Sequence, residues 1–305
     1  SRTCLGMREN TLFEATQIKP APGTGCRVVG VDPAPANEST VCFWSKNGLT
    51  FKDLEHHELL HFIQSCKGKS KVLVVWDAPL TGPPVLKHLT GENYPKGYFT
   101  KRWIEKYFTN GDGCKTPTGI NTRSFSELSH WTITKAFTGL PLLGPYCEKG
   151  QLPFNHLVSA KTEFSEYRPN IVETHPAVAI YLWLKKTTKL NDSIDWTYKG
   201  KSGKKKKIKK TNLELFTTSL KSKIGKMLEL DFFDTPIEDD NKLDAFVAWA
   251  LGCLFTEGKK DEVQILGDRC TGSMLLPVAA SDETLLRDGF KKWLTKVNLP
   301  YRTTM

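Results

Sequence analysis

Five carboxylates occupy positions where the chain leaves, or enters, an apolar segment. Asp32 ends the run CRVVGVD, Asp77 follows KVLVVW, and Glu173 follows the apolar pair before it in NIVE. Asp240 and Asp244 are four residues apart in a segment with helical periodicity, so they share one helix face. Because the carboxyl ends of parallel strands meet at one edge of a sheet, one cleft can collect all five side chains.

Carboxylates gathered this closely repel one another as free anions, and a divalent cation removes the repulsion. Oxygen ligands favour Mg²⁺ or Mn²⁺, and two such ions ~4 Å apart serve the hydrolysis of phosphodiester bonds. We expect Asp32 to bridge two ions and Asp77 and Asp244 to complete the metal ligands. Glu173 or Asp240 would ligate a metal or orient the attacking water. The ordinary alternatives are a turn or helix-cap role for each aspartate and an ion pair with a neighbouring helix for Glu173.

The apolar runs predict the elements that position these acids. Three strand-length runs between residues 26 and 55, the last two joined at Asn47-Gly48, indicate three adjacent antiparallel strands. A helix follows over HHELLHFIQSCKGK, with a stop at Lys67-Gly68, and residues 71–76 are typical of a buried parallel strand. A strand at 170–173, a helix from Pro176, and helices over 213–230 and 238–255, the last of them taken as the final helix, complete the pattern. The prediction is an α/β fold, a mixed sheet with flanking helices.

We expect a single domain over residues 26–305, preceded by an N-terminal extension at 1–25. A helical insertion is predicted over about 81–169, with helices near 101–108 and 125–137. A lysine-rich loop is predicted over about 199–210.

The charge of the chain is concentrated in that lysine-rich stretch. The chain has 43 Lys and Arg against 33 Asp and Glu, a net charge of +10. Eight of the lysines lie between Lys199 and Lys210, and without them the net charge falls to +2. A basic segment favours nucleic acid as a partner, and a solvated loop is the alternative. The candidate phosphate-binding residues are Lys204, Lys205, Lys206, Lys207, Lys209 and Lys210.

Composition excludes a membrane-embedded protein and a largely disordered one, and it favours one compartment. A hydrophobic fraction of 39% is that of a globular protein, and no run approaches the ~20 apolar residues of a membrane span. The 8 cysteines are scattered without a C-x-x-C pair, which is typical of reduced thiols. We therefore expect a cytoplasmic protein with no membrane partner, or a nuclear one if the source is eukaryotic.

Five segments also resemble, in their order, the motifs of a known family. They are GVDPAP at 30–35, VVWDAPLTGPP at 74–84, VETHPAVAIY at 172–181, DDNKLDAFVAWA at 239–250 and GDRCTGSMLLPV at 267–278. Together they resemble the domain of unknown function 429 family of predicted RNase H-like nucleases. The resemblance implies an RNase H-like fold with acids at Asp32, Asp77 and Asp244. The family tends to have an acid three residues before the last aspartate, where this chain has Asn241, so the helix would ligate a metal through Asp244 alone.

Two other functions remain open. In one, the acids are structural and the chain is a non-catalytic nucleic-acid-binding protein. In the other, the HELLH segment makes the chain a zinc hydrolase, with His57 and His61 as zinc ligands on one helix face and Glu58 as the base. No motif for a third zinc ligand follows before the strand at residue 71.

Overall fold

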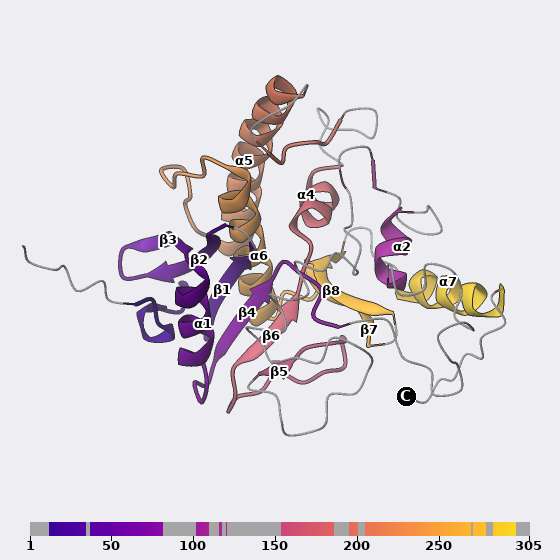
Figure 1. Cartoon of the computed structure of the whole chain (residues 1–305), viewed down its shortest axis with the longest axis horizontal. Coiled ribbons are helices and arrows are strands. Elements are labelled where there is room, and N and C mark those ends of the chain that lie inside the picture. Colours follow the sequence, from indigo (N-terminus) through magenta and orange to yellow (C-terminus); the bar gives the residue numbers. More distant parts are fainter. Residues whose placement is uncertain are drawn as a thin grey trace, which may run out of the picture.

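The fold is described from a computed structural model of the chain (Figure 1). It describes residues 12–34, 37–81, 102–109, 116–117, 120, 154–185, 195–200, 205–269, 271–278 and 283–296. The predicted helix near 125–137 and most of the predicted insertion lie outside these residues.

The centre of the molecule is a six-stranded mixed sheet with the order β3-β2-β1-β4-β6-β5. β1 is antiparallel to β2, and β2 to β3, which confirms the three antiparallel strands expected from the sequence. β4, β6 and β5 continue the sheet parallel to β1. The strands are β1 (Arg27–Asp32), β2 (Ser39–Ser45), β3 (Gly48–Leu54), β4 (Val72–Trp76), β5 (Asn155–His156) and β6 (Asn170–Glu173).

Helices cover both faces of this sheet because its central strands are apolar on both sides. Val28, Leu73 and Val75 lie in one core, with side chains from α4 (Pro176–Leu184), α5 (Lys206–Leu228) and α6 (Asp240–Thr256). Val29 and Val74 point to the opposite face, where α1 (His56–Ser65) packs. The prediction of an α/β fold with helices on both faces of a mixed sheet is confirmed.

The described part of the predicted N-terminal extension is packed against the domain. Phe13, Ala15 and Ile18 are fully buried in the core that also contains the apolar side chains of α1. The short 3₁₀ helix η1 (Ala15–Gln17) is bound to α1, since the Ala15 amide donates to Ser65 Oγ over 2.9 Å. Residues 12–25 thus contribute to the same hydrophobic core as the sheet.

The lysine-rich stretch differs from its prediction as a loop. α5 begins at Lys206, so the last lysines of the stretch form the first turns of a helix of 23 residues. Lysine is a good helix former, and Asn212 and Phe216 on the following turns are buried against the body of the protein. The loop prediction is therefore wrong for residues 206–210, and Lys204 lies outside the described residues.

Four further elements pack against one another, and one of them contacts β6. The antiparallel pair β7 (Val263–Asp268) and β8 (Gly272–Pro277) forms a second small sheet. α2 (Trp103–Thr109) agrees with the helix expected near 101–108, and α7 (Glu283–Lys296) packs against it. Because α7 follows α6, the prediction that the acid-bearing helix is the final one is wrong. Every helix among the described residues is too short or too polar to cross a lipid bilayer.

Candidate metal centre

Asp32 and Asp77 lie side by side because the strands that carry them are parallel neighbours. Val31 of β1 is in register with Trp76 of β4, and the Asp77 amide continues the ladder by donating to the Val31 carbonyl over 3.0 Å. Asp32 is the last residue of β1, and Asp77 immediately follows β4. Both side chains therefore leave the sheet at the same edge, as the sequence predicts.

Asp244 reaches this edge from α6, which crosses over β1 in close contact. The helix begins where Asp239 accepts a hydrogen bond from the Lys242 amide over 2.9 Å, the usual role of an aspartate at a helix N-cap. Gly30 on β1 leaves room for the helix, since a Cβ at that position would lie 2.1 Å from the Ala245 carbonyl oxygen. Asp244 is thereby buried, with 1% of its surface exposed.

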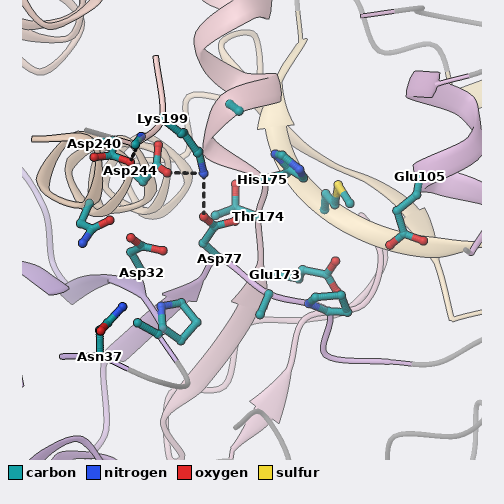
Figure 2. A pocket seen from close by; sticks show the side chains of 18 of the residues that line it. Asp32, Asn37, Asp77, Glu105, Glu173, Thr174, His175, Lys199, Asp240 and Asp244 are labelled. Carbon is teal, nitrogen blue, oxygen red and sulfur yellow. Dashed lines mark hydrogen bonds and ion pairs between the residues drawn. The ribbon is translucent and has the colours of Figure 1, made fainter. Parts of the chain in front are cut away.

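The three aspartates converge on one point (Figure 2). One carboxylate oxygen from each of Asp32, Asp77 and Asp244 lies within 4.8 Å of the other two. Among the described residues they are the one group of three or more His, Cys, Asp or Glu side chains placed to share a metal ion. They line a cleft of about 580 Å³. Three oxygen donors of this kind can bind a divalent cation.

A lysine and a tyrosine that are adjacent in sequence bind the buried aspartate. Lys199 Nζ lies 2.5 Å from Asp244 Oδ2 and 4.0 Å from Asp77 Oδ2. The hydroxyl of Tyr198 donates to Asp244 Oδ1 over 2.5 Å. Both oxygens of Asp244 therefore accept hydrogen bonds from the chain itself.

The protonation of these groups follows from burial and from the charges around them. Burial raises the pKa of the Asp244 carboxyl, while Lys199 and Tyr198 oppose that change by stabilising the carboxylate. Burial would lower the pKa of the Lys199 ammonium, but the charges of Asp244, Asp77 and Asp32 outweigh it and raise this pKa. Burial and the charge of Asp244 raise the pKa of Tyr198 well above its ordinary value. Lys199 is thus a cation and Tyr198 a neutral donor at neutral pH.

Asp240 lines the same cleft but has a different contact. Its Oδ2 accepts a hydrogen bond from the Gly200 amide over 3.0 Å. The metal-ligand cluster does not include it, and Asn241 beside it is exposed. From this helix, Asp244 alone lies in the group of three aspartates, and Asp240 anchors the segment that carries Lys199.

Glu173 is buried in an ion pair, the alternative that the sequence left open. Its carboxylate accepts from both terminal nitrogens of Arg102, one at 2.8 Å, and from the Leu80 amide over 2.9 Å. Glu105 accepts from the same guanidinium, through Nε over 2.7 Å. Burial raises the pKa of Glu173, and Arg102 opposes this effect. A role as metal ligand or as the residue orienting water is therefore not supported for Glu173.

The HELLH segment lies within α1, and its polar side chains bind either Glu55 or Glu14. His57 Nδ1 is 3.3 Å from Glu55, and His61 Nε2 is 3.2 Å from Glu14. The Glu58 side chain accepts from the Glu55 amide over 2.9 Å and completes a capping box. No three-ligand group within the described ranges includes either histidine. The zinc hypothesis therefore gains no support from this segment.

The sequence groups Lys199 with the lysine-rich stretch, whereas the structure places it beside Asp244 and Asp77. The signal that separates it is the alternation just before it, where Trp196 and Tyr198 are buried and Thr197 lies between them. Arg102 was also missed, because its partners Glu105 and Glu173 are close in space but Glu173 is 71 residues away in the chain. Of the predicted phosphate-binding lysines, Lys205, Lys206, Lys207 and Lys210 are exposed and Lys209 is half-buried.

Comparisons of the chain with protein-family models, with curated proteins and with solved structures found no match.

Proposed function

We propose that this protein is a divalent-metal-dependent nuclease that hydrolyses phosphodiester bonds of nucleic acid. The observation that carries the proposal is the convergence of Asp32, Asp77 and Asp244 from three separate elements within 4.8 Å of one another. These are also the three acids that the family resemblance implies. The local sequence patterns of three distant segments and the convergence of their side chains therefore indicate the same three residues.

We further propose that the sheet is RNase H-like. The three antiparallel strands at the start, the parallel fourth strand beside the first, and the buried helix carrying the last acid support this assignment. The acids sit at the carboxyl ends of neighbouring parallel strands, where open α/β sheets place their sites.

In this proposal Asp32, Asp77 and Asp244 hold Mg²⁺ or Mn²⁺ through their oxygens. A bound ion of this kind activates water and stabilises charge on the phosphate. Asp32 and Asp77 are half-buried at the cleft wall, and the phosphate would enter from the open side. Asp240 and Tyr198 orient neighbouring groups.

The exposed lysines at the start of α5 support a polyanionic substrate. Anions are favoured at helix N-termini, and lysines there oppose the helix dipole. A phosphate backbone relieves this unfavourable arrangement. Lys206 and Lys207 are both exposed at this end of the helix.

The test is Asp32→Asn, which is nearly isosteric and removes one ligand charge. Mutation of a residue that hydrogen-bonds to a metal ligand typically costs about 10–100-fold in metal affinity or activity. Because Asp32→Asn changes a ligand itself, we expect cleavage of nucleic acid to fall at least about 100-fold. Asp77→Asn should behave alike. The control is Asp261→Asn at an exposed aspartate before β7, which should retain the parent rate. Rates are measured with single-stranded and duplex DNA and RNA, with Mg²⁺ and with Mn²⁺.

One observation favours a second candidate function. Lys199 forms an ion pair with Asp244 over 2.5 Å, as it would if the acids were structural in a non-catalytic nucleic-acid-binding protein. In that case the parent binds nucleic acid without cutting any of the four substrates, and Asp32→Asn leaves its affinity unchanged. Cleavage by the parent that Asp32→Asn retains in full would contradict the active-site assignment.

A further inference from the structure

Lys199 is held beside Asp77 and Asp244 by the segment around it. Residues 198–200 lie across the first turns of α6 and make three successive contacts, from the Tyr198 hydroxyl, the Lys199 ammonium and the Gly200 amide. The first two reach Asp244 and the third reaches Asp240. Figure 2 shows the Lys199 ammonium between the carboxylates of Asp244 and Asp77. α5 supports this segment, because Asn212 Nδ2 donates to the Thr197 carbonyl over 3.0 Å.

The ammonium itself has little freedom to leave. It contacts two carboxylates, and it lies 5.8 Å from the ring centroid of Tyr198, within the range of a cation–π interaction. Its side chain is 38% exposed, so one side remains open to the cleft. A surface lysine without such contacts would not have a fixed position.

The charges of the three aspartates and Lys199 indicate how many divalent cations this cluster can hold. Asp32, Asp77 and Asp244 carry three negative charges, and Lys199 reduces the sum to two. One divalent cation balances that remainder. A second ion would have to displace or closely approach the Lys199 ammonium, at a large electrostatic cost.

We propose that Lys199 occupies the position of a second metal ion, so that the centre works with a single divalent cation and a fixed ammonium. The inference rests on the proposed nuclease function and replaces the two ions expected from the sequence. In hydrolysis of a phosphodiester, the water oxygen forms a bond to phosphorus and the bond from phosphorus to the leaving oxygen breaks. The attacking water releases a proton to solvent, and the leaving oxygen takes one from solvent. Lys199 keeps its own proton and stabilises the negative charge that develops on the phosphate.

The test counts Mn²⁺ ions bound per chain, by calorimetry and by the electron paramagnetic resonance of free Mn²⁺, with no nucleic acid present. The parent should bind one Mn²⁺ at the cluster. Lys199→Met should bind two, and the first should bind at least about tenfold more tightly, because a nearby positive charge is gone. Lys199→Arg keeps the charge and should bind one. Lys242→Met, which removes a lysine of α6 paired with Glu238, is the matched control and should also bind one.

Cleavage supplies a second readout. Lys199→Met should lose cleavage at low Mg²⁺ and regain part of it as Mg²⁺ is raised, whereas Lys199→Arg should retain part of the activity at low Mg²⁺. Two Mn²⁺ ions at the cluster of the parent, or one ion bound with unchanged affinity by Lys199→Met, would overturn the inference, as would the absence of Mn²⁺ binding. If the predicted counts are found but no nucleic acid is cut, the proposed function fails while the assignment of Lys199 stands. Thermal unfolding of each variant verifies that it is folded.

Discussion

His156 is a buried histidine for which no hydrogen-bond partner is found at either ring nitrogen within the described part of the chain. It is 5% exposed on the edge strand β5. Burial, and the positive charges of Arg269 and Arg102, lower its pKa from 6.5 to about 3. The folded protein therefore keeps this ring neutral at pH values where the unfolded chain takes up a proton.

The sign of the pH effect follows from that difference. The folded state has the lower pKa, so its full stability is present above pH 6.5 and is lost as the pH falls from 6.5 toward 3. The loss is about 1.4 kcal/mol per pH unit from this group. His156→Leu removes the group, and we expect the parent to lose about 2 kcal/mol more than the variant between pH 7 and pH 5. Urea unfolding at the two pH values measures this, and equal losses would contradict it.

Single residues also show where sequence reasoning ends. The positions of Asp32 and Asp77 were predictable because each follows an apolar strand. Adjacent parallel strands end at the same edge of the sheet, so residues at their ends lie close together. Glu173 has the same local pattern and yet is bound by Arg102. A local pattern carries no information about a partner 71 residues away. The sequence therefore left open whether Glu173 serves the metal site or forms an ion pair.

At the scale of elements, the centre depends on how closely α6 approaches β1. A Cβ on Gly30 would lie 2.1 Å from the Ala245 carbonyl oxygen and 2.4 Å from the Trp249 amide nitrogen. Both are backbone atoms of the helix, so the helix as a whole would have to shift. Such a shift would move Asp244, which is adjacent to Ala245, away from Asp32.

Gly30→Ala should therefore affect both stability and metal binding. Overpacking of a core costs about 1–3 kcal/mol, and we expect at least that loss in urea unfolding. Mn²⁺ affinity should fall as well, because the three carboxylates no longer converge. Gly25→Ala is the matched control, since a Cβ there has nothing within 4 Å. A Gly30→Ala protein with parent stability and parent Mn²⁺ affinity would show that α6 can move without disturbing the centre.

Elements that contain a continuous apolar run were predicted well from the sequence, and elements without one were not. The apolar runs identified β1, β4, β6 and α6, since burial of a central strand or helix requires continuous apolar sequence. The start of α5 was mistaken for a loop because its lysines read as a solvated charge run, and helix propensity alone is a weak signal. The β7–β8 pair was not expected, although Gly272 at φ +80 marks the start of β8 after the turn.

At the scale of the whole molecule, the proposed binding of nucleic acid depends either on the net charge of the chain, +10, or on where its lysines lie. α5 is roughly 34 Å long, and it extends past the sheet and the other helices (Figure 1). Its exposed lysines include Lys206 and Lys207 at the start and Lys223 and Lys226 toward the end. Neutralising either pair changes the net charge of the protein equally.

We expect the two pairs to differ in binding. In an Asp32→Asn background, where we expect cleavage to be suppressed, Lys206→Gln with Lys207→Gln should reduce the salt dependence of duplex binding by about 0.9 log unit for each lost phosphate contact. The pair Lys223→Gln with Lys226→Gln should leave the slope close to that of Asp32→Asn alone. The measurement is Kd for a short DNA duplex over a series of salt concentrations. Equal slopes for the two pairs would mean that binding follows net charge rather than position.

Stability provides an independent check on the same variants. Positive charge is unfavourable near a helix N-terminus and favourable near its C-terminus, by about 0.3–1 kcal/mol per residue. Removing Lys206 and Lys207 should therefore leave the protein as stable as the parent or slightly more stable, while removing Lys223 and Lys226 should not stabilise it. Because the helix dipole disfavours Lys206 and Lys207, a loss of duplex binding without a loss of stability would assign these two lysines to the nucleic acid. If the Lys206 and Lys207 variant instead unfolds more easily, the two lysines serve the fold and the electrostatic part of the substrate proposal fails.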